Sequence, residues 1–139
     1  MMKKSNKKGF TLVELIVVIA IMAILAAVLV PTITNKINDA NKSSAETSAS
    51  SIANAIQSEI VSVLSGAKDT NNKYVKSTAG GTVEGIKDTA ETSKTVTEGS
   101  ATIEIKYTAN DSFTVQATVS GQKSSVYTIK VADGSITKA

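Results

Sequence analysis

A single ionisable side chain, Glu14, lies inside a run of otherwise uncharged and mostly apolar residues that extends from Phe10 to Val30. A carboxylate within an apolar segment costs free energy unless it has a partner, so its presence indicates a functional residue. Four lysines precede the run without any acid to balance them: Lys3, Lys4, Lys7 and Lys8. The chemistry to explain is therefore the pairing of one acid in an apolar environment with a base.

The run that carries Glu14 has the length of a membrane-spanning helix. At about 1.5 Å of rise per residue it extends roughly 30 Å, which is the thickness of the hydrocarbon core of a bilayer. The four lysines favour a cytoplasmic location for the N-terminus, so the rest of the chain is expected across the membrane. We therefore interpret Lys3, Lys4, Lys7 and Lys8 as topology determinants.

The junction between the lysines and the run has a specific pattern, Lys7-Lys8-Gly9-Phe10-Thr11-Leu12-Val13-Glu14-Leu15, and Pro31 closes the run. This stretch resembles the class III signal of type IV pilins and pseudopilins. The resemblance implies that a prepilin peptidase cuts between Gly9 and Phe10, and that the new N-terminal Phe10 is N-methylated. It also implies that Glu14 serves filament assembly. It covers about Lys7 to Pro31, and the rest of the chain resembles the family only in plan.

A cut after Gly9 would supply the missing partner of Glu14. It creates an α-amino group on Phe10, and residues 10 and 14 are i, i+4 neighbours on one face of a helix. An amine and a carboxylate buried between packed helices can neutralise each other. In the family this pairing is thought to run between adjacent subunits.

Three other interpretations of the N-terminus compete with this one. An ordinary secretory signal peptide would be cut near Ala26-Ala27, but the run is long for its apolar region and contains an acid. A plain single-pass anchor explains the lysines and the length, but not Glu14 or the Gly9-Phe10 junction. A buried helix of a soluble protein explains neither the basic flank nor the length.

Composition excludes several classes of function. The chain has 139 residues and a formal charge of +3, but four of its lysines lie in the leader, so the mature side chains sum to −1. All basic residues are lysines, and this argues against a specific nucleic-acid site because arginine is the usual reader of phosphate and guanine. The chain contains neither cysteine nor histidine. We therefore expect no disulfide, no metal site and no cofactor, and no catalytic motif supports an enzyme. Many pilins of double-membraned bacteria have a disulfide near the C-terminus, so its absence, with the lysine-rich composition, favours a Gram-positive source.

The remainder of the chain predicts an α+β fold. Apolar residues continue at helical spacing after Pro31, which should kink the helix without ending it, as far as Leu64 and a stop at Gly66. A connecting region follows at about 66–100, with one short strand near 82–86. From Ala101 the apolar residues alternate, which predicts three strands around residues 103–107, 113–119 and 127–131 with turns at 110–111 and 120–121. The stripe from Ile33 to Leu64 is expected to cover the apolar face of this sheet.

The resulting plan is type IV pilin-like, with a long N-terminal helix packed under a three- to four-stranded antiparallel sheet. Residues 1–9 form a leader, 10–31 a transmembrane or filament-core half-helix, and 32–139 a globular domain. Its parts are an amphipathic half-helix at about 32–65, the connection at about 66–100 and the sheet at about 101–137.

The leading functional hypothesis is a structural subunit that polymerises with copies of itself into a type IV pilus. It implies an inner or cytoplasmic membrane precursor, a prepilin peptidase, an assembly platform with its ATPase, and a final location on the cell surface. The alternative is a pseudopilin of a competence or type II secretion system. A membrane-tethered adhesin, from another class, predicts a concave site or an exposed aromatic cluster.

Overall fold

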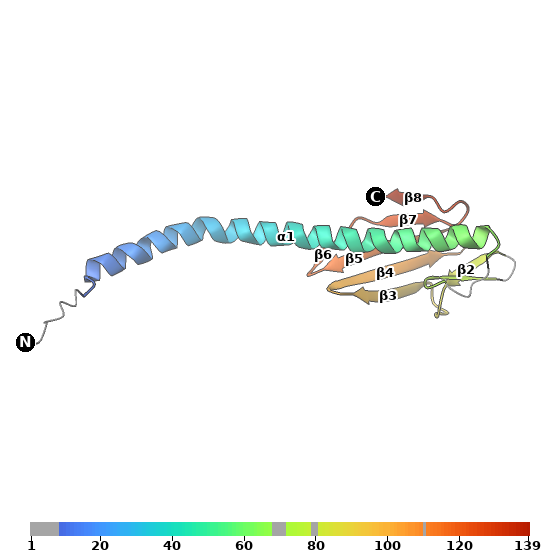
Figure 1. Cartoon of the computed structure of the whole chain (residues 1–139), viewed down its shortest axis with the longest axis horizontal. Helices are drawn as coiled ribbons and strands as arrows, with labels where there is room; N and C mark the ends of the chain where they lie inside the picture. Colours follow the sequence, from blue (N-terminus) through green and yellow to red (C-terminus); the bar gives the residue numbers. More distant parts are fainter. Residues whose placement is uncertain (1–8, 68–71, 79–80, 110) are drawn as a thin grey trace, which may run out of the picture. The chain divides into compact units, whose positions relative to one another are not determined.

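The structure is a computed structural model, and it describes residues 9–67, 72–78, 81–109 and 111–139. The chain divides into two compact units, Met1–Ile37 and Asn38–Ala139. One helix, α1 (Leu12–Leu64), contributes residues to both units, and all strands belong to the second. Figure 1 shows these elements. The division into a leader, a half-helix to residue 31 and a globular domain from residue 32 stays a prediction.

Helix α1 continues through Pro31, as the resumed apolar spacing predicted. Proline has no N–H and leaves one carbonyl of the preceding turn without its helical donor. Nearby hydroxyl groups add hydrogen bonds: Thr32 Oγ1 donates to the carbonyl of Val28 and Thr34 Oγ1 to that of Val30, both at 3.0 Å. The carbonyl that lacks its donor is that of Ala27, so these two bonds do not replace the one that Pro31 removes.

The C-terminus of α1 is fixed by a glycine, as expected. Gly66 has a φ of 82°, a left-handed conformation that glycine adopts without steric cost. Its N–H donates to the carbonyl of Val63 at 2.9 Å, and Ala67 N–H donates to that of Ser62 at 3.1 Å. These two bonds form a Schellman motif, which satisfies carbonyls that the end of a helix would otherwise leave unpaired.

The strands form two antiparallel sheets. A six-stranded sheet has the order β3-β4-β5-β7-β8, with β6 also paired to β5, and a two-stranded sheet contains β1 and β2. Their bounds are β1 Val75–Ser77, β2 Val83–Ile86, β3 Ser93–Glu98, β4 Ala101–Thr108, β5 Ser112–Val119, β6 Gln122–Lys123, β7 Tyr127–Lys130 and β8 Ile136–Lys138. The α+β class and the three long predicted strands, which correspond to β4, β5 and β7, are confirmed.

The number of strands and the connecting region differ from the prediction. The main sheet has six strands rather than three or four, and the segment 66–100 contains β1, β2 and β3 rather than one strand near 82–86. Strand β3 was missed because its burial does not alternate strongly, since it lies at the sheet edge. Strand β1 has only three residues, too few for a period to show. Both strands depend on pairing with the next strand in the chain, β2 for β1 and β4 for β3, rather than on a periodic pattern of their own.

The predicted turn at 120–121 is confirmed by its backbone. Ser120 and Gly121 have φ values of 47° and 81°, and they join β5 to β6 as a two-residue loop between the paired Val119 and Gln122. Two successive positive φ values are the signature of the tight turns that match the twist of a hairpin. The other predicted turn includes residue 110, which lies outside the described residues.

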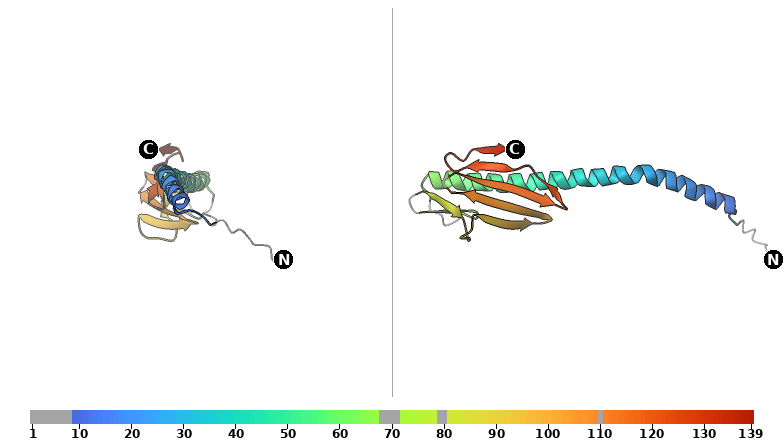
Figure 2. Two further views of the ribbon diagram at one scale, coloured as in Figure 1. Left: turned by 90° about the vertical axis from the view of Figure 1, so that its left-hand side faces the viewer. Right: turned by 180° about the vertical axis from the view of Figure 1, so that it is seen from behind.

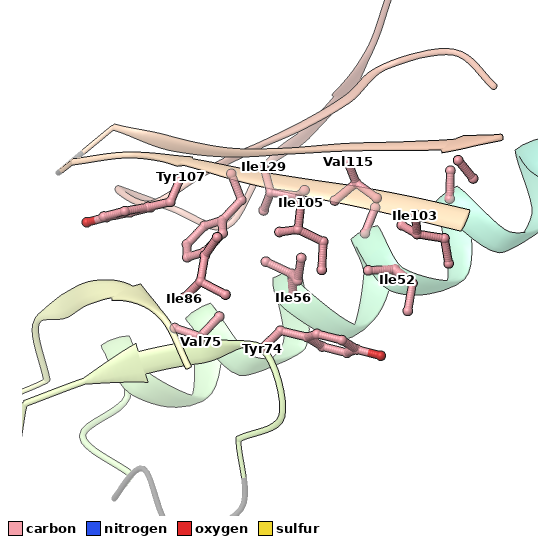
Figure 3. Close-up of a cluster of buried hydrophobic side chains, with 14 of the residues drawn as sticks. Ile52, Ile56, Tyr74, Val75, Ile86, Ile103, Ile105, Tyr107, Val115 and Ile129 are labelled. Atoms are coloured by element: carbon pink, nitrogen blue, oxygen red, sulfur yellow. The ribbon is translucent and has the colours of Figure 1, made fainter. Parts of the chain in front are cut away.

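The core lies between α1 and the concave side of the sheets. In Figure 3, Ile52 and Ile56 of the helix point toward Ile103, Ile105 and Val115 of the main sheet. Valine and isoleucine side chains of β1 and β2 close the core from another side. Figure 2 gives two further views, in which the main sheet curls around this part of α1.

The helical stripe that the sheet covers is shorter than predicted. It comprises Ala45, Ala49, Ile52, Ala53, Ile56, Ile60 and Val63, whereas Ile33, Ile37 and Leu64 are about half exposed. The reason is a difference in rise: an eight-residue strand extends about 26 Å, and a helix needs only about 18 residues for that length. A sheet of this size cannot cover a stripe that begins at Ile33.

Candidate processing and assembly site

The predicted cleavage junction lies on exposed, non-helical chain. Gly9 and Phe10 precede α1, both are exposed, and the Phe10 side chain is 91% exposed. A Cβ atom added to Gly9 would meet nothing within 4 Å, so no contact within the protein requires a glycine there. The four lysines that we predicted to set topology lie outside the described residues.

Glu14 has a local partner that we did not predict. Its Oε2 accepts hydrogen bonds from Thr11 N–H at 2.9 Å and from the Thr11 hydroxyl at 3.1 Å. In return, Glu14 N–H donates to Thr11 Oγ1 at 3.2 Å. This reciprocal arrangement is a capping box, with Thr11 as N-cap and Glu14 at the third helical position. Glu14 therefore also satisfies backbone groups at the start of α1.

The sequence contained the signal for this cap, namely a threonine followed three residues later by a glutamate before an apolar run. Our expectation that Phe10 and Glu14 are helical neighbours concerned the chain cut after Gly9, and the structure describes the uncut chain. Because α1 begins at Leu12, Phe10 precedes the helix in the uncut chain, and the i, i+4 relation of helical neighbours does not apply to it. Pairing of the Phe10 amine with Glu14, within one chain or between copies, stays a prediction.

The apolar half of α1 is exposed along its length. Large apolar side chains from Leu12 to Val30 are roughly half to three-quarters exposed. Within the described residues, α1 is the one helix that is long and apolar enough to cross a membrane. Its most apolar 18-residue segment has a mean hydropathy of 3.1, and none of that segment is buried. Apolar surface of this extent requires lipid or another apolar surface to cover it.

A second group of polar side chains on α1 binds the sheet unit and was not predicted. Glu59 accepts three backbone N–H bonds, from Lys73 at 2.7 Å, Tyr74 at 2.9 Å and Val75 at 2.8 Å. Gln57 Nε2 donates to the carbonyl of Gly134 at 2.9 Å. These bonds attach segments on both sides of the helix, and no local sequence pattern indicates them because the partners are distant in the chain.

Glu46 makes the densest set of these contacts. Its Oε1 accepts bonds from Ser125 N–H and Oγ, and its Oε2 accepts one from Tyr127 Oη, all at 2.8 Å. Lys138 Nζ lies 3.3 Å from the same Oε2. The backbone bond from Ser125, aided by the other donors and opposed by desolvation, lowers the pKa of Glu46 to about 2. The carboxylate is therefore charged over the whole physiological range of pH.

The features expected of an adhesin are weakly developed. A depression of about 80 Å³ lies on the outer face of β4 and β5, lined by Glu104, Lys106, Thr114, Val115, Gln116 and Val126. Ligand sites are commonly several times larger, at roughly 300–1,000 Å³. Of the five aromatic residues, only Phe10 is largely exposed, since Tyr127 is half-buried and the other three are buried.

The fold and the N-terminal segment together define the class of protein: an α+β chain whose apolar N-terminal helix follows a lysine-rich segment. A comparison with protein families finds the prokaryotic N-terminal methylation motif at residues 4–30. No curated protein and no solved structure matches the chain. This motif is the class III signal of type IV pilins and pseudopilins, and it supports a precursor of that type. This type is structural rather than enzymatic, and it fits a membrane-anchored precursor that becomes part of a surface pilus.

Proposed function

We propose that this protein is the structural subunit of a type IV pilus, which polymerises on the cell surface after cleavage at Gly9-Phe10 and methylation of Phe10. The observation that carries the proposal is the methylation motif at residues 4–30 on an apolar helix whose side chains are exposed. The motif implies processing by a prepilin peptidase. The exposed helix supplies the surface that neighbouring copies would bury.

Burial of the apolar half-helix would drive assembly. Each large apolar side chain contributes about 1.5–3 kcal/mol when it is removed from water, but lipid tails remove it equally well. Assembly therefore needs an interaction that makes the free energy of the packed filament lower than that of the subunit in lipid. A charged pair between the Phe10 amine of one copy and Glu14 of the next supplies it, because this pair forms only between packed subunits.

Assembly also requires partners outside this chain. We propose that a platform protein in the membrane and its ATPase extract the processed subunit, because a helix of this hydropathy does not leave the bilayer spontaneously. The subunit itself carries out no catalytic step. No nucleic-acid site, metal or cofactor takes part in this proposal.

The first test concerns processing. Mass spectrometry of the mature protein should show a chain that begins at Phe10 and is heavier by one methyl group. The substitution Gly9→Val should block the cut, since a branched side chain fills a peptidase site that accepts glycine. Gly9 has open space around it, so the precursor itself should fold normally, and Gly9→Ala is the graded control. A mature chain that begins near Val28 would contradict the proposal.

The second test separates a pilus from a pseudopilus. Electron microscopy of the source cell, with and without this protein, should show long surface fibres only when the protein is present. Antibodies against the sheet unit should label these fibres along their length. Processed protein that stays in the membrane without long fibres would instead indicate a pseudopilin.

A further inference from the structure

The last hairpin of the chain lies at the edge of the main sheet. Among the described strands, β8 pairs only with β7, through three residue pairs from Tyr127–Lys138 to Ile129–Ile136. In Figures 1 and 2 this hairpin lies on the opposite side of α1 from β3. An edge strand this short has few interactions to hold it, and a released edge offers unpaired backbone groups to other chains.

No covalent bond closes this end of the fold, because the sequence has no cysteine. The backbone contributes one further pair: Ala139 N–H donates to the carbonyl of Val126 at 3.0 Å, and Val126 N–H donates to that of Ala139 at 3.2 Å. The turn that precedes β8 is attached to α1 by the bond between Gln57 and the Gly134 carbonyl. Both ends of β8 are thus tied down.

Glu46 joins these parts through one side chain. Its carboxylate contacts Ser125, which lies two residues before β7, Tyr127 in β7, and Lys138 in β8. The Lys138 ammonium also lies 5.7 Å from the centre of the Tyr127 ring, within the range of a cation–π interaction. The Glu46 side chain is only 22% exposed, so water competes weakly for these bonds.

We infer that Glu46, Ser125, Tyr127 and Lys138 form a noncovalent clasp that fastens the C-terminal hairpin to α1 and keeps β8 paired with β7. The clasp acts where a disulfide would act in a chain with cysteines: it restrains a terminal segment that its own pairing holds weakly. One charged carboxylate accepts all four contacts, and hydrogen bonds to a charged group are stronger than those between neutral groups.

The clasp has a consequence that rests on the proposed function. In a filament, copies of the chain stand side by side at high local concentration, which favours exchange of identical strands between them. A fastened β8 remains on its own subunit and leaves the edge of β7 covered. The clasp therefore protects assembled subunits from strand exchange.

Hydrogen exchange of the full-length protein in detergent micelles, read by mass spectrometry, tests the clasp directly. The variant Glu46→Gln keeps an oxygen for Ser125 but cannot pair with Lys138, and Lys138→Met removes only the ammonium group. We expect Glu46→Gln to speed exchange in residues 126–139 about tenfold or more, and Lys138→Met to do so less. In every variant, amides of β4 and β5 should stay far better protected than those of residues 126–139, because opening the clasp is a local event.

A matched control is Lys106→Met. It breaks the exposed ion pair between Lys106 and Glu104, 3.1 Å long, on the outer face of the same sheet, and should leave residues 126–139 unchanged. Protection that is equal in β4, β5 and the C-terminal residues would overturn the clasp, because the hairpin would then open only when the whole unit unfolds. Unchanged exchange in Glu46→Gln would overturn it as well. The measurement needs no filaments, so its result tests the clasp independently of the pilus proposal.

Discussion

At the scale of single residues, Glu14 has two roles that a substitution must separate. In the described chain it caps α1 through Thr11, and we propose that it pairs with the Phe10 amine of a neighbouring copy after cleavage. The cap needs an oxygen acceptor at the third helical position, which glutamine also provides. The pairing needs a negative charge, which glutamine lacks.

We therefore predict that the Glu14→Gln and Glu14→Ala proteins are still cleaved after Gly9 but accumulate in the membrane. Cells that make either variant should form few or no filaments. Loss of one member of a buried charged pair costs about 3–5 kcal/mol because the other charge is left uncompensated, and every subunit would bear this cost. Shearing of cells followed by immunoblotting measures filament yield. Glu14→Asp should be intermediate, because its carboxylate reaches one methylene less.

The glutamine variant decides between the two roles. If Glu14→Gln assembles like the wild type while Glu14→Ala does not, the cap and not the charge serves assembly. The substitution Thr11→Val gives the reciprocal check, since it removes the hydroxyl partner and leaves the charge. Under our proposal it should weaken filament yield less than Glu14→Gln does.

Glu46 predicts how stability depends on pH. Its pKa is about 2 in the folded protein against 4.5 for an ordinary glutamate, so the folded state favours the charged form. Its contribution is complete above pH 4.5 and is lost as the pH falls toward 2. Thermal unfolding followed by circular dichroism should show wild type more stable than Glu46→Gln at neutral pH. The two proteins should converge toward pH 2, and a constant difference down to that pH would contradict the assignment.

At the scale of elements, two glycines share a left-handed backbone but differ in their surroundings. Gly66, at the end of α1, has nothing within 4 Å of an added Cβ. Gly134, in the turn between β7 and β8, has a φ of 71°, and its added Cβ would lie 2.9 Å from Val61 Cγ2. Val61 is β-branched and helical, so its side chain has little freedom to move away.

This pair predicts a graded loss of stability. Gly66→Ala should cost about 1–2 kcal/mol, the penalty for a left-handed alanine. Gly134→Ala should cost about 1–3 kcal/mol more, because it also crowds the contact between the turn and α1. The midpoints of thermal unfolding compare the two variants under one condition. Equal losses would show that the turn does not pack against Val61 as described.

At the scale of the whole chain, the two units differ in what covers their apolar side chains. In the second unit the helical stripe from Ala45 to Val63 is buried, whereas the large apolar residues from Phe10 to Ile37 are exposed. The second unit contains all strands and the described core.

A fragment that begins at Asn38 should therefore be soluble and monomeric, with mixed helix and sheet in its circular dichroism spectrum. The full chain should need detergent, because its first unit exposes a continuous apolar surface. Size-exclusion chromatography and light scattering measure the state of each. A fragment that aggregates or lacks a cooperative thermal transition would contradict the division into a membrane unit and a self-sufficient folded unit.

The sequence by itself determined the features that depend on neighbouring residues. The apolar run, the basic flank and the Gly9-Phe10 junction are local, and the methylation motif at residues 4–30 confirms their resemblance to the class III signal. Cleavage at this junction and the role of the lysines in topology stay predictions. The helix to Leu64, its stop at Gly66, and the strands β4, β5 and β7 follow from period and turn chemistry, which act over a few residues. The capping box of Thr11 and Glu14 was equally local and was overlooked.

Only the tertiary structure decided the features that depend on pairing or packing and leave no periodic pattern in the sequence. Strands β1, β3 and β8 have weak patterns of their own and exist through pairing, and the covered stripe begins at Ala45 because the length of the strands sets it. The hydrogen bonds of Glu46, Glu59 and Gln57 join residues separated by 14 to 81 positions. From the sequence alone, these polar side chains are predicted to lie on the solvent-exposed face of an amphipathic helix. Their burial and their hydrogen bonds to distant loops do not change the periodicity of the sequence.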